Sequence, residues 1–95
     1  MKTHAYITHE YAHGEVWFGQ VDISFDDGED MVGVILEANT DTIVAKVFTH
    51  GSSDLVMKTY AWPDGCKGDV KAAFTVTAIK AAIWVRDSIS RTIRS

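Results

Sequence analysis

The fold is decided by residues 17–47, which read WFGQVDISFDDGEDMVGVILEANTDTIVAKV. Asp27 and Gly28, near the middle of this stretch, are a two-residue turn signal, and a loop of this kind pairs Asp26 with Glu29. Counting outward from the turn brings small and apolar residues opposite one another across two antiparallel strands. The pairs are Ile23 with Val32, Val21 with Val34, Gly19 with Leu36, and Trp17 with Ala38. One face of this hairpin is therefore almost wholly apolar.

Further strands are predicted on both sides of this hairpin. A turn near Asn39-Thr40 carries the apolar face into a strand whose inward positions hold Ile43, Ala45 and Val47. Upstream, residues rich in strand formers predict another hairpin, closed by His13-Gly14 with glycine at the second loop position. The last strand has two open registers, with either Leu55 and Met57 or Val56, Tyr60 and Trp62 facing inward. The five predicted strands are near residues 2–12, 15–25, 31–38, 42–50 and 55–62.

The C-terminal part of the chain predicts one long helix, from Asp69 as the N-cap to about Ile93. At 100° per residue, one arc is broad enough to cover the sheet, and it contains Phe74, Ala78, Ala81, Ala82, Val85 and Ile89. A second apolar arc contains Ala72, Val76, Ile79 and Ile83. The predicted fold is α+β, a five-stranded antiparallel β-meander packed on one face by a single C-terminal α-helix. We expect residues 1–95 to form one domain.

Composition is typical of a small globular protein. The chain has 95 residues, of which 46% are hydrophobic, so one domain can bury a core without disulfides or metals. The N-terminus does not resemble a signal peptide, and the apolar run from Met31 to Leu36 is too short to cross a bilayer. We therefore expect a cytoplasmic protein. The single Cys66 cannot form an internal disulfide, which agrees with a reducing compartment.

Charge is distributed unevenly along the chain. Residues 1–66 contain eleven Asp and Glu against three Lys, a net charge of −8, whereas residues 67–95 contain six Lys and Arg against two Asp, a net charge of +4. Phosphates would be repelled by the acidic sheet, so direct binding of duplex DNA is not expected. Cations near the end of the helix complement the partial negative charge of its C-terminus.

The sheet face that points away from the helix has more apolar residues than a solvated face needs. Its expected members are Ile7, Tyr11, Val16, Phe18, Ile35, Val44 and Phe48. Either the last strand or the first hairpin curls over this face to close a barrel-like core, or the surface binds another molecule. For a binding surface, the expected interface residues are Val76, Ile79 and Ile83 on the helix, Phe18 and Phe48 on the sheet, and Asp26, Asp27, Glu29 and Asp30 at the hairpin tip.

One motif suggests metal chemistry. Residues 9–13 read HEYAH and match H-E-x-x-H, in which two histidines one helical turn apart bind zinc and the glutamate activates a water. This chemistry requires a helix, but the segment is rich in strand formers. A strand would separate His9 from His13 by about 13 Å, too far for both to bind one ion. We therefore expect neither a bound metal nor another cofactor.

Two other features carry weaker signals. The acidic hairpin tip could hold a calcium or magnesium ion loosely, but its spacing fits no EF-hand loop, and solubilising the tip is the simpler role. Cys66 lies before a helix N-terminus and beside Lys67, which can lower a thiol pKa, yet no residue is placed by sequence to complete a nucleophilic site. We therefore interpret the acidic residues as solubilising the hairpin tip and Cys66 as a thiol without a chemical role.

Without a catalytic set, the sequence favours a non-enzymatic protein-interaction module. We expect an inhibitor that occupies or masks a macromolecular partner, in the way that phage or mobile-element anti-defence proteins such as anti-CRISPRs, or toxin-immunity proteins, do. An acidic surface suits a basic partner, such as a nucleic-acid-handling complex. Two alternatives stay open: a small zinc-dependent hydrolase that uses His9 and His13, and a structural subunit of a homodimer or larger homo-oligomer.

Overall fold

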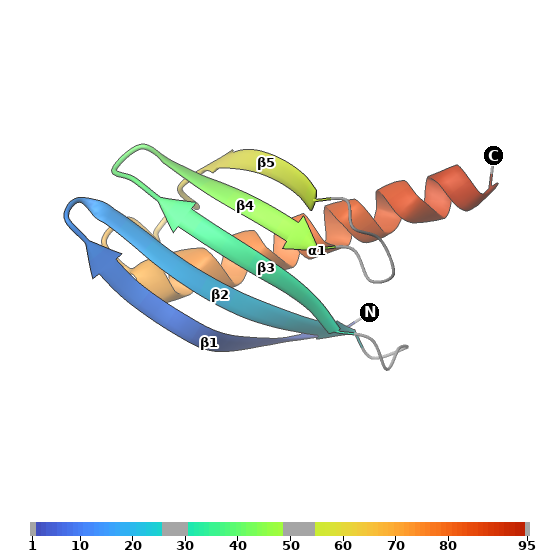
Figure 1. Ribbon diagram of the computed structural model, residues 1–95, viewed down its shortest axis with the longest axis horizontal. Helices are drawn as coiled ribbons and strands as arrows, with labels where there is room; N and C mark the ends of the chain where they lie inside the picture. The colour runs from blue at the N-terminus through green and yellow to red at the C-terminus, as the bar shows by residue number, and fades with distance from the viewer. Residues whose placement is uncertain (1, 26–30, 49–54, 95) are drawn as a thin grey trace.

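The computed structural model describes residues 2–25, 31–48 and 55–94. Five strands lie side by side in chain order and form one antiparallel sheet, and a C-terminal helix crosses one face of this sheet (Figure 1). The elements are β1 (Thr3–His13), β2 (Val16–Phe25), β3 (Met31–Ala38), β4 (Thr42–Phe48), β5 (Leu55–Ala61) and α1 (Val70–Arg94). The helix contacts all five strands. The predicted α+β meander is confirmed.

The register of the central hairpin follows from its apolar pattern. Ile23 pairs with Val32, Val21 with Val34, Gly19 with Leu36 and Trp17 with Ala38, as predicted. A shift by one residue would turn every one of these side chains to the other face, so burial of one face determines the register. The Asp27-Gly28 turn that the prediction started from lies outside the described residues.

Asn39 organises the turn between β3 and β4. Its Oδ1 accepts hydrogen bonds from the backbone N–H groups of Asp41 and Thr42, both at 2.8 Å. Its own N–H donates to the carbonyl of Thr42, and its carbonyl accepts the indole N–H of Trp62 at 2.8 Å. An asparagine side chain that satisfies the backbone two and three residues ahead is a common turn device. The predicted position of this turn is confirmed.

The first hairpin differs from its prediction by one residue. His13 pairs with Val16, so the loop consists of Gly14 and Glu15, and glycine is at the first loop position instead of the second. Gly14 has φ of +65°, whereas Glu15 does not have a positive φ. Positive φ at the first position alone is the requirement of a type II′ turn, which explains why glycine is needed there.

A β-bulge in β1 changes which side chains face outward. Ile7 pairs with Val21, but the next pair is His9 with Gln20, so Thr8 is extra on its strand. Before the bulge, the even-numbered side chains of β1 therefore face away from the helix, whereas after it the odd-numbered side chains do. Ile7 shares the helix-facing side with Val21, and its predicted place on the outward face is wrong. A prediction based on strict alternation is wrong for part of β1, because the sequence carries no clear signal for the extra residue.

The core is formed between the helix-facing side of the sheet and one side of α1. Five of the six predicted helix residues, Phe74, Ala78, Ala81, Ala82 and Val85, are buried. The side chain of the sixth, Ile89, lies outside the described part of the structure. Ala73 and Thr77 are buried as well. Small residues at these positions let the helix axis approach the sheet closely, so the apolar surfaces of both elements are removed from water.

The second apolar arc of α1 is not free in solvent. Ile79 and Ile83 are half-buried and pack against the core, and Val76 is also half-buried. These three side chains, named above as expected interface residues, are therefore partly covered within a single chain. Among the described residues, no helix is both long and apolar enough to cross a membrane.

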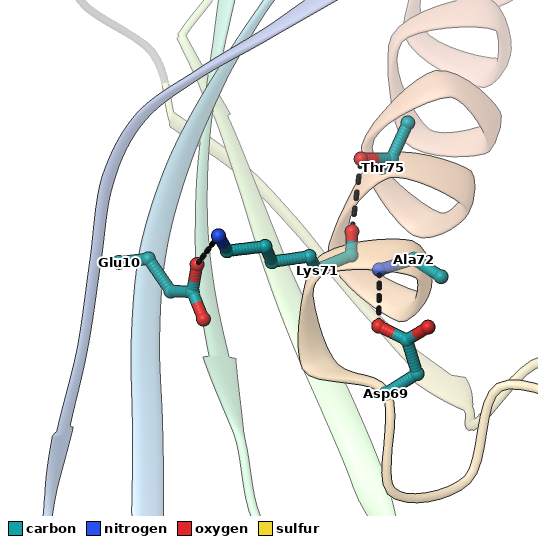
Figure 2. A network of polar contacts seen from close by, with 5 residues as sticks. All are labelled: Glu10, Asp69, Lys71, Ala72 and Thr75. Carbon is teal, nitrogen blue, oxygen red and sulfur yellow. Dashed lines mark hydrogen bonds and ion pairs between the residues drawn. The ribbon is translucent and has the colours of Figure 1, made fainter.

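Asp69 caps the helix, as predicted. Its Oδ1 accepts the N–H of Ala72 at 3.2 Å, and Thr75 Oγ1 donates to the carbonyl of Lys71 at 2.9 Å (Figure 2). The side chain of Lys71 extends from the helix toward β1, where its Nζ lies 3.9 Å from Glu10 Oε2. An exposed ion pair of this kind contributes at most about 1 kcal/mol. It nevertheless places Glu10 on the helix-facing side of the sheet.

Both edge strands carry a charged residue on their helix-facing side. Glu10 of β1 and Lys58 of β5 occupy the two ends of one row across the sheet, since Glu10 pairs with Gly19 and Lys58 with Ala45. The Lys58 Nζ lies 4.6 Å from the ring centre of Trp84 on α1. Inward-facing charges and a bulge at an edge disfavour the addition of another strand. The sheet is open at β1 and β5, but neither edge strand is suited to pairing with a further strand.

Candidate interaction surface

The candidate site is the sheet face opposite α1, called the outer face below. The strand pairings arrange its side chains in rows that run from β1 to β5. One row consists of Tyr11, Phe18, Glu37, Val44 and Thr59, and the next of His9, Gln20, Ile35, Lys46 and Met57. A third row contains Tyr6, Asp22, Gly33 and Phe48. Since β1 and β5 do not contact each other, the described strands form an open sheet, not the barrel-like core considered above.

Large apolar side chains are exposed mainly on this face. In the described residues, six large hydrophobic side chains are exposed, and four of them belong to the outer face: Tyr6 at 54%, Tyr11 at 60%, Phe48 at 50% and Met57 at 59%. The other two are Ile7 at the β1 edge and Trp84 on α1. Tyrosine, phenylalanine and methionine are enriched at protein interfaces relative to ordinary surface. The outer face therefore has the composition of a binding surface.

A stacked aromatic pair lies at one end of the outer face. The rings of Tyr11 and Phe18 have centres 5.2 Å apart and planes inclined by 19°. Phe18 is half-buried, and Glu37, its partner on β3, is exposed. No ion pair or hydrogen bond of the Glu37 carboxylate is found among the described residues. The row thus presents a flat aromatic pair followed directly by a carboxylate.

The remaining charged groups of the outer face are few. Asp22 is paired with the exposed Tyr6 and accepts one long hydrogen bond, 3.4 Å, from Gln20 Nε2. Lys46 is half-buried on β4, one row away from Glu37. In addition, β1 places His9 and His13 on this face, next to Gln20 and Val16. Among its described residues, the face therefore has two carboxylates, each next to an aromatic side chain, against one lysine.

The predicted interface residues are not brought together into one site. Phe18 and Phe48 share the outer face, as expected, whereas Val76, Ile79 and Ile83 lie on α1 at the other side of the sheet. The acidic tip residues Asp26, Asp27, Glu29 and Asp30 fall outside the described residues. Sequence reasoning missed Tyr6, which the bulge turns outward, and Met57, whose orientation depends on the register of β5. That register is now settled in favour of Val56 and Tyr60 facing inward.

The H-E-x-x-H motif is part of a strand. His9 and His13 both lie in β1, four residues apart, which separates their backbones by about 13 Å. Glu10 points to the opposite side of the sheet, where it contacts Lys71. In the described ranges, no group of three or more His, Cys, Asp or Glu side chains is close enough to hold a metal ion. The helical geometry that this zinc motif requires is not formed.

Tyr60 contains a buried polar atom without a partner. Its hydroxyl is removed from solvent and makes no hydrogen bond within the described part of the chain, and the same holds for Thr77 Oγ1. Burial raises the pKa of Tyr60 above its ordinary value of 10.0. Cys66 is half-buried against the core within the β5–α1 loop. Both residues lie on the helix side of the sheet, away from the outer face.

Comparison with known proteins adds no relative. No protein-family model, no curated protein and no solved structure matches this chain.

Proposed function

We propose that this protein is a non-catalytic interaction module that binds a protein partner through the outer face of its sheet. The observation that carries the proposal is the collection of Tyr6, Tyr11, Phe48 and Met57 on one uncovered face, where they expose half or more of their surface. A large apolar side chain gains about 1.5–3 kcal/mol on going from full exposure to full burial, so one that exposes only about half of its surface gains roughly half of that when a partner covers it. Aromatic anchors of this kind dominate the binding energy of many protein interfaces.

The arrangement of the edges supports a face-to-face contact. A partner strand added to β1 or β5 would have to accommodate the bulge at Thr8, the Glu10–Lys71 ion pair or the Lys58 ammonium. The outer face offers no comparable obstacle. By occupying a partner's surface, the module would act as an inhibitor that masks a macromolecule, as small anti-defence and toxin-immunity proteins do.

Affinity capture from the native host tests the proposal. The wild-type chain is compared with a variant in which Tyr11 and Phe48 are both replaced by Ser, and with the control Trp84→Ser, which removes an exposed aromatic ring from the helix side. We expect the specific partner to be retained by the control and lost by the outer-face variant, with both variants folded by circular dichroism. Equal capture by all three proteins would contradict the proposal.

Light scattering during size exclusion distinguishes the homo-oligomer alternative. If the wild type is a dimer that the Tyr11 and Phe48 substitutions convert to a monomer, the outer face joins copies of this chain. If the wild type is a monomer and the same substitutions abolish capture of the partner, the result supports an interaction module that binds a different protein.

A further inference from the structure

We infer that the outer face recognises arginine side chains of a basic protein partner, with the Tyr11–Phe18 stack and Glu37 forming one guanidinium-binding position. This inference rests on the proposed function and specifies the chemistry of the partner. It uses three observations: the stacked rings, the unpaired carboxylate beside them, and the repetition of an aromatic–carboxylate pair elsewhere on the same face.

The geometry of the first position suits a planar cation. Tyr11, Phe18 and Glu37 are successive members of one row on β1, β2 and β3. A guanidinium group stacks on aromatic rings and donates two parallel hydrogen bonds to a carboxylate, which a lysine ammonium cannot do. Glu37 is exposed and has no ion pair in the described part of the chain, so a partner's cation need not displace an existing one.

A second position repeats the pattern. Tyr6 and Asp22 face each other directly across β1 and β2, and Tyr6 is more than half exposed. Asp22 lies four residues from Phe18 on the same strand, which corresponds to about 13 Å along the sheet. The Gln20 hydrogen bond to Asp22 is long, at 3.4 Å, and leaves most of the carboxylate available. Two arginines about 13 Å apart would match both positions.

Charge complementarity favours a basic protein over nucleic acid. Exposed aromatic rings on a sheet can also stack on bases, but such proteins combine them with a positively charged groove that follows the phosphates. Here each aromatic–carboxylate pair places a negative charge where a phosphate would approach, and Lys46 is the only Lys or Arg among the described residues of the face. The first 66 residues carry a net charge of −8, which attracts a cationic partner from a distance.

Titration of the isotope-labelled full-length chain with two model peptides tests the inference. Hexa-arginine and hexa-lysine carry the same charge, and about 150 mM salt screens attraction beyond roughly 8 Å. We expect hexa-arginine to bind at least threefold more tightly than hexa-lysine and to shift the amide signals of Tyr11, Phe18 and Glu37. Glu37→Gln should weaken arginine binding about two- to fivefold. Asp41→Asn, the same charge change in the β3–β4 turn, should leave it within about twofold of wild type.

Several results would overturn the inference. Equal affinities for the two peptides, or equal losses in Glu37→Gln and Asp41→Asn, would show unspecific charge attraction. Tighter binding of a single-stranded oligonucleotide than of hexa-arginine would assign the face to nucleic acid, and a dimer that buries the outer-face amides would assign it to a second copy. If hexa-arginine fails to bind but the Tyr11 and Phe48 substitutions still abolish partner capture, the interaction module stands and only its arginine specificity is wrong.

Discussion

The ring of Phe74 lies against the backbone of Gly19, so that a β-carbon placed on Gly19 would stand 2.6 Å from the ring atoms Cδ2 and Cε2. This contact joins the second turn of α1 to β2. Phe74 is fully buried, and it can reach this depth only because β2 has no side chain at position 19. Glycine normally weakens a strand interior, but here it makes room for the largest fully buried side chain of the core.

The first prediction concerns this contact. Gly19→Ala should lower the free energy of unfolding by about 1–3 kcal/mol, because the added methyl group overlaps the Phe74 ring and also lies only 3.2 Å from the backbone oxygen of His9. Urea denaturation measures the change. Gly33→Ala is the matched control, since its added carbon would lie 3.6 Å from Asp22 Oδ1, an ordinary contact distance on the outer face. Equal stability of the two variants would show that Phe74 does not occupy this space.

The second prediction concerns the β1–β2 turn. Gly14 has φ of +65°, and a β-carbon there would meet nothing within 4 Å, so any cost of substitution comes from backbone strain alone. Gly14→Val should destabilise the protein by about 1–3 kcal/mol. Glu15→Val, at the neighbouring loop position without a positive φ, should change stability by less than about 0.5 kcal/mol. Equal melting temperatures for the two variants would contradict a turn in which Gly14 alone has a positive φ.

The third prediction concerns Tyr60 and alkaline pH. Burial raises the pKa of its hydroxyl in the folded protein, while the unfolded chain releases this proton near pH 10. The contribution of Tyr60 to stability is therefore fully present below pH 10 and is lost as the pH rises through the raised value. Tyr60→Phe should remove this part of the alkaline decline. At neutral pH the substitution should be neutral or slightly stabilising, because it deletes a hydroxyl without a hydrogen-bond partner in the described residues.

The fourth prediction concerns the H-E-x-x-H segment. Since His9 and His13 are about 13 Å apart on a strand, the purified protein should contain no stoichiometric zinc and show no peptidase activity. Elemental analysis of the protein after metal-free dialysis is the measurement. About one zinc per chain, lost equally in His9→Ala and His13→Ala, would contradict the strand and restore the hydrolase alternative.

The fifth prediction concerns the flank of α1. Ile79 packs half-buried against the core, so Ile79→Glu should lower the free energy of unfolding by about 1–3 kcal/mol through lost burial and the desolvation of a charge. Light scattering is measured alongside the thermal melt. An unchanged melting temperature together with conversion of a dimer to a monomer would instead make this flank a self-association surface.

The sequence predicts most of the fold because one physical signal dominates it. Alternating apolar residues in β2, β3 and β4 admit a single register that buries one face, and Val21, Val34 and Val47 lie in one row as a result. The helix cap at Asp69 can also be predicted locally, because its hydrogen bond joins Asp69 to Ala72, only three residues ahead. These features depend either on residues that are close in the chain or on the alternation of side chains between the two faces of a strand. Counting residues along the sequence is therefore enough to predict them.

The candidate surface is harder to predict because it depends on irregular features. The bulge at Thr8 turns Tyr6 outward and Ile7 inward, and β1 lacks a glycine at the bulge that would signal it. Met57 faces outward only because β5 pairs with β4 in one of the two registers that the sequence leaves open. The partial burial of Ile79 depends on how the helix packs on the sheet, which is a property of the whole structure and of no single segment.

The order of the elements has a consequence for synthesis. Each strand pairs with its immediate successor, so the sheet can assemble as the chain leaves the ribosome. The helix that covers the inner side comes after every strand, and Val21, Ile23 and Leu36 are without cover until it emerges. A nascent chain that stalls before Val70 would expose this apolar layer to aggregation or to chaperones. Burial of this apolar layer therefore has to wait for the last quarter of the chain.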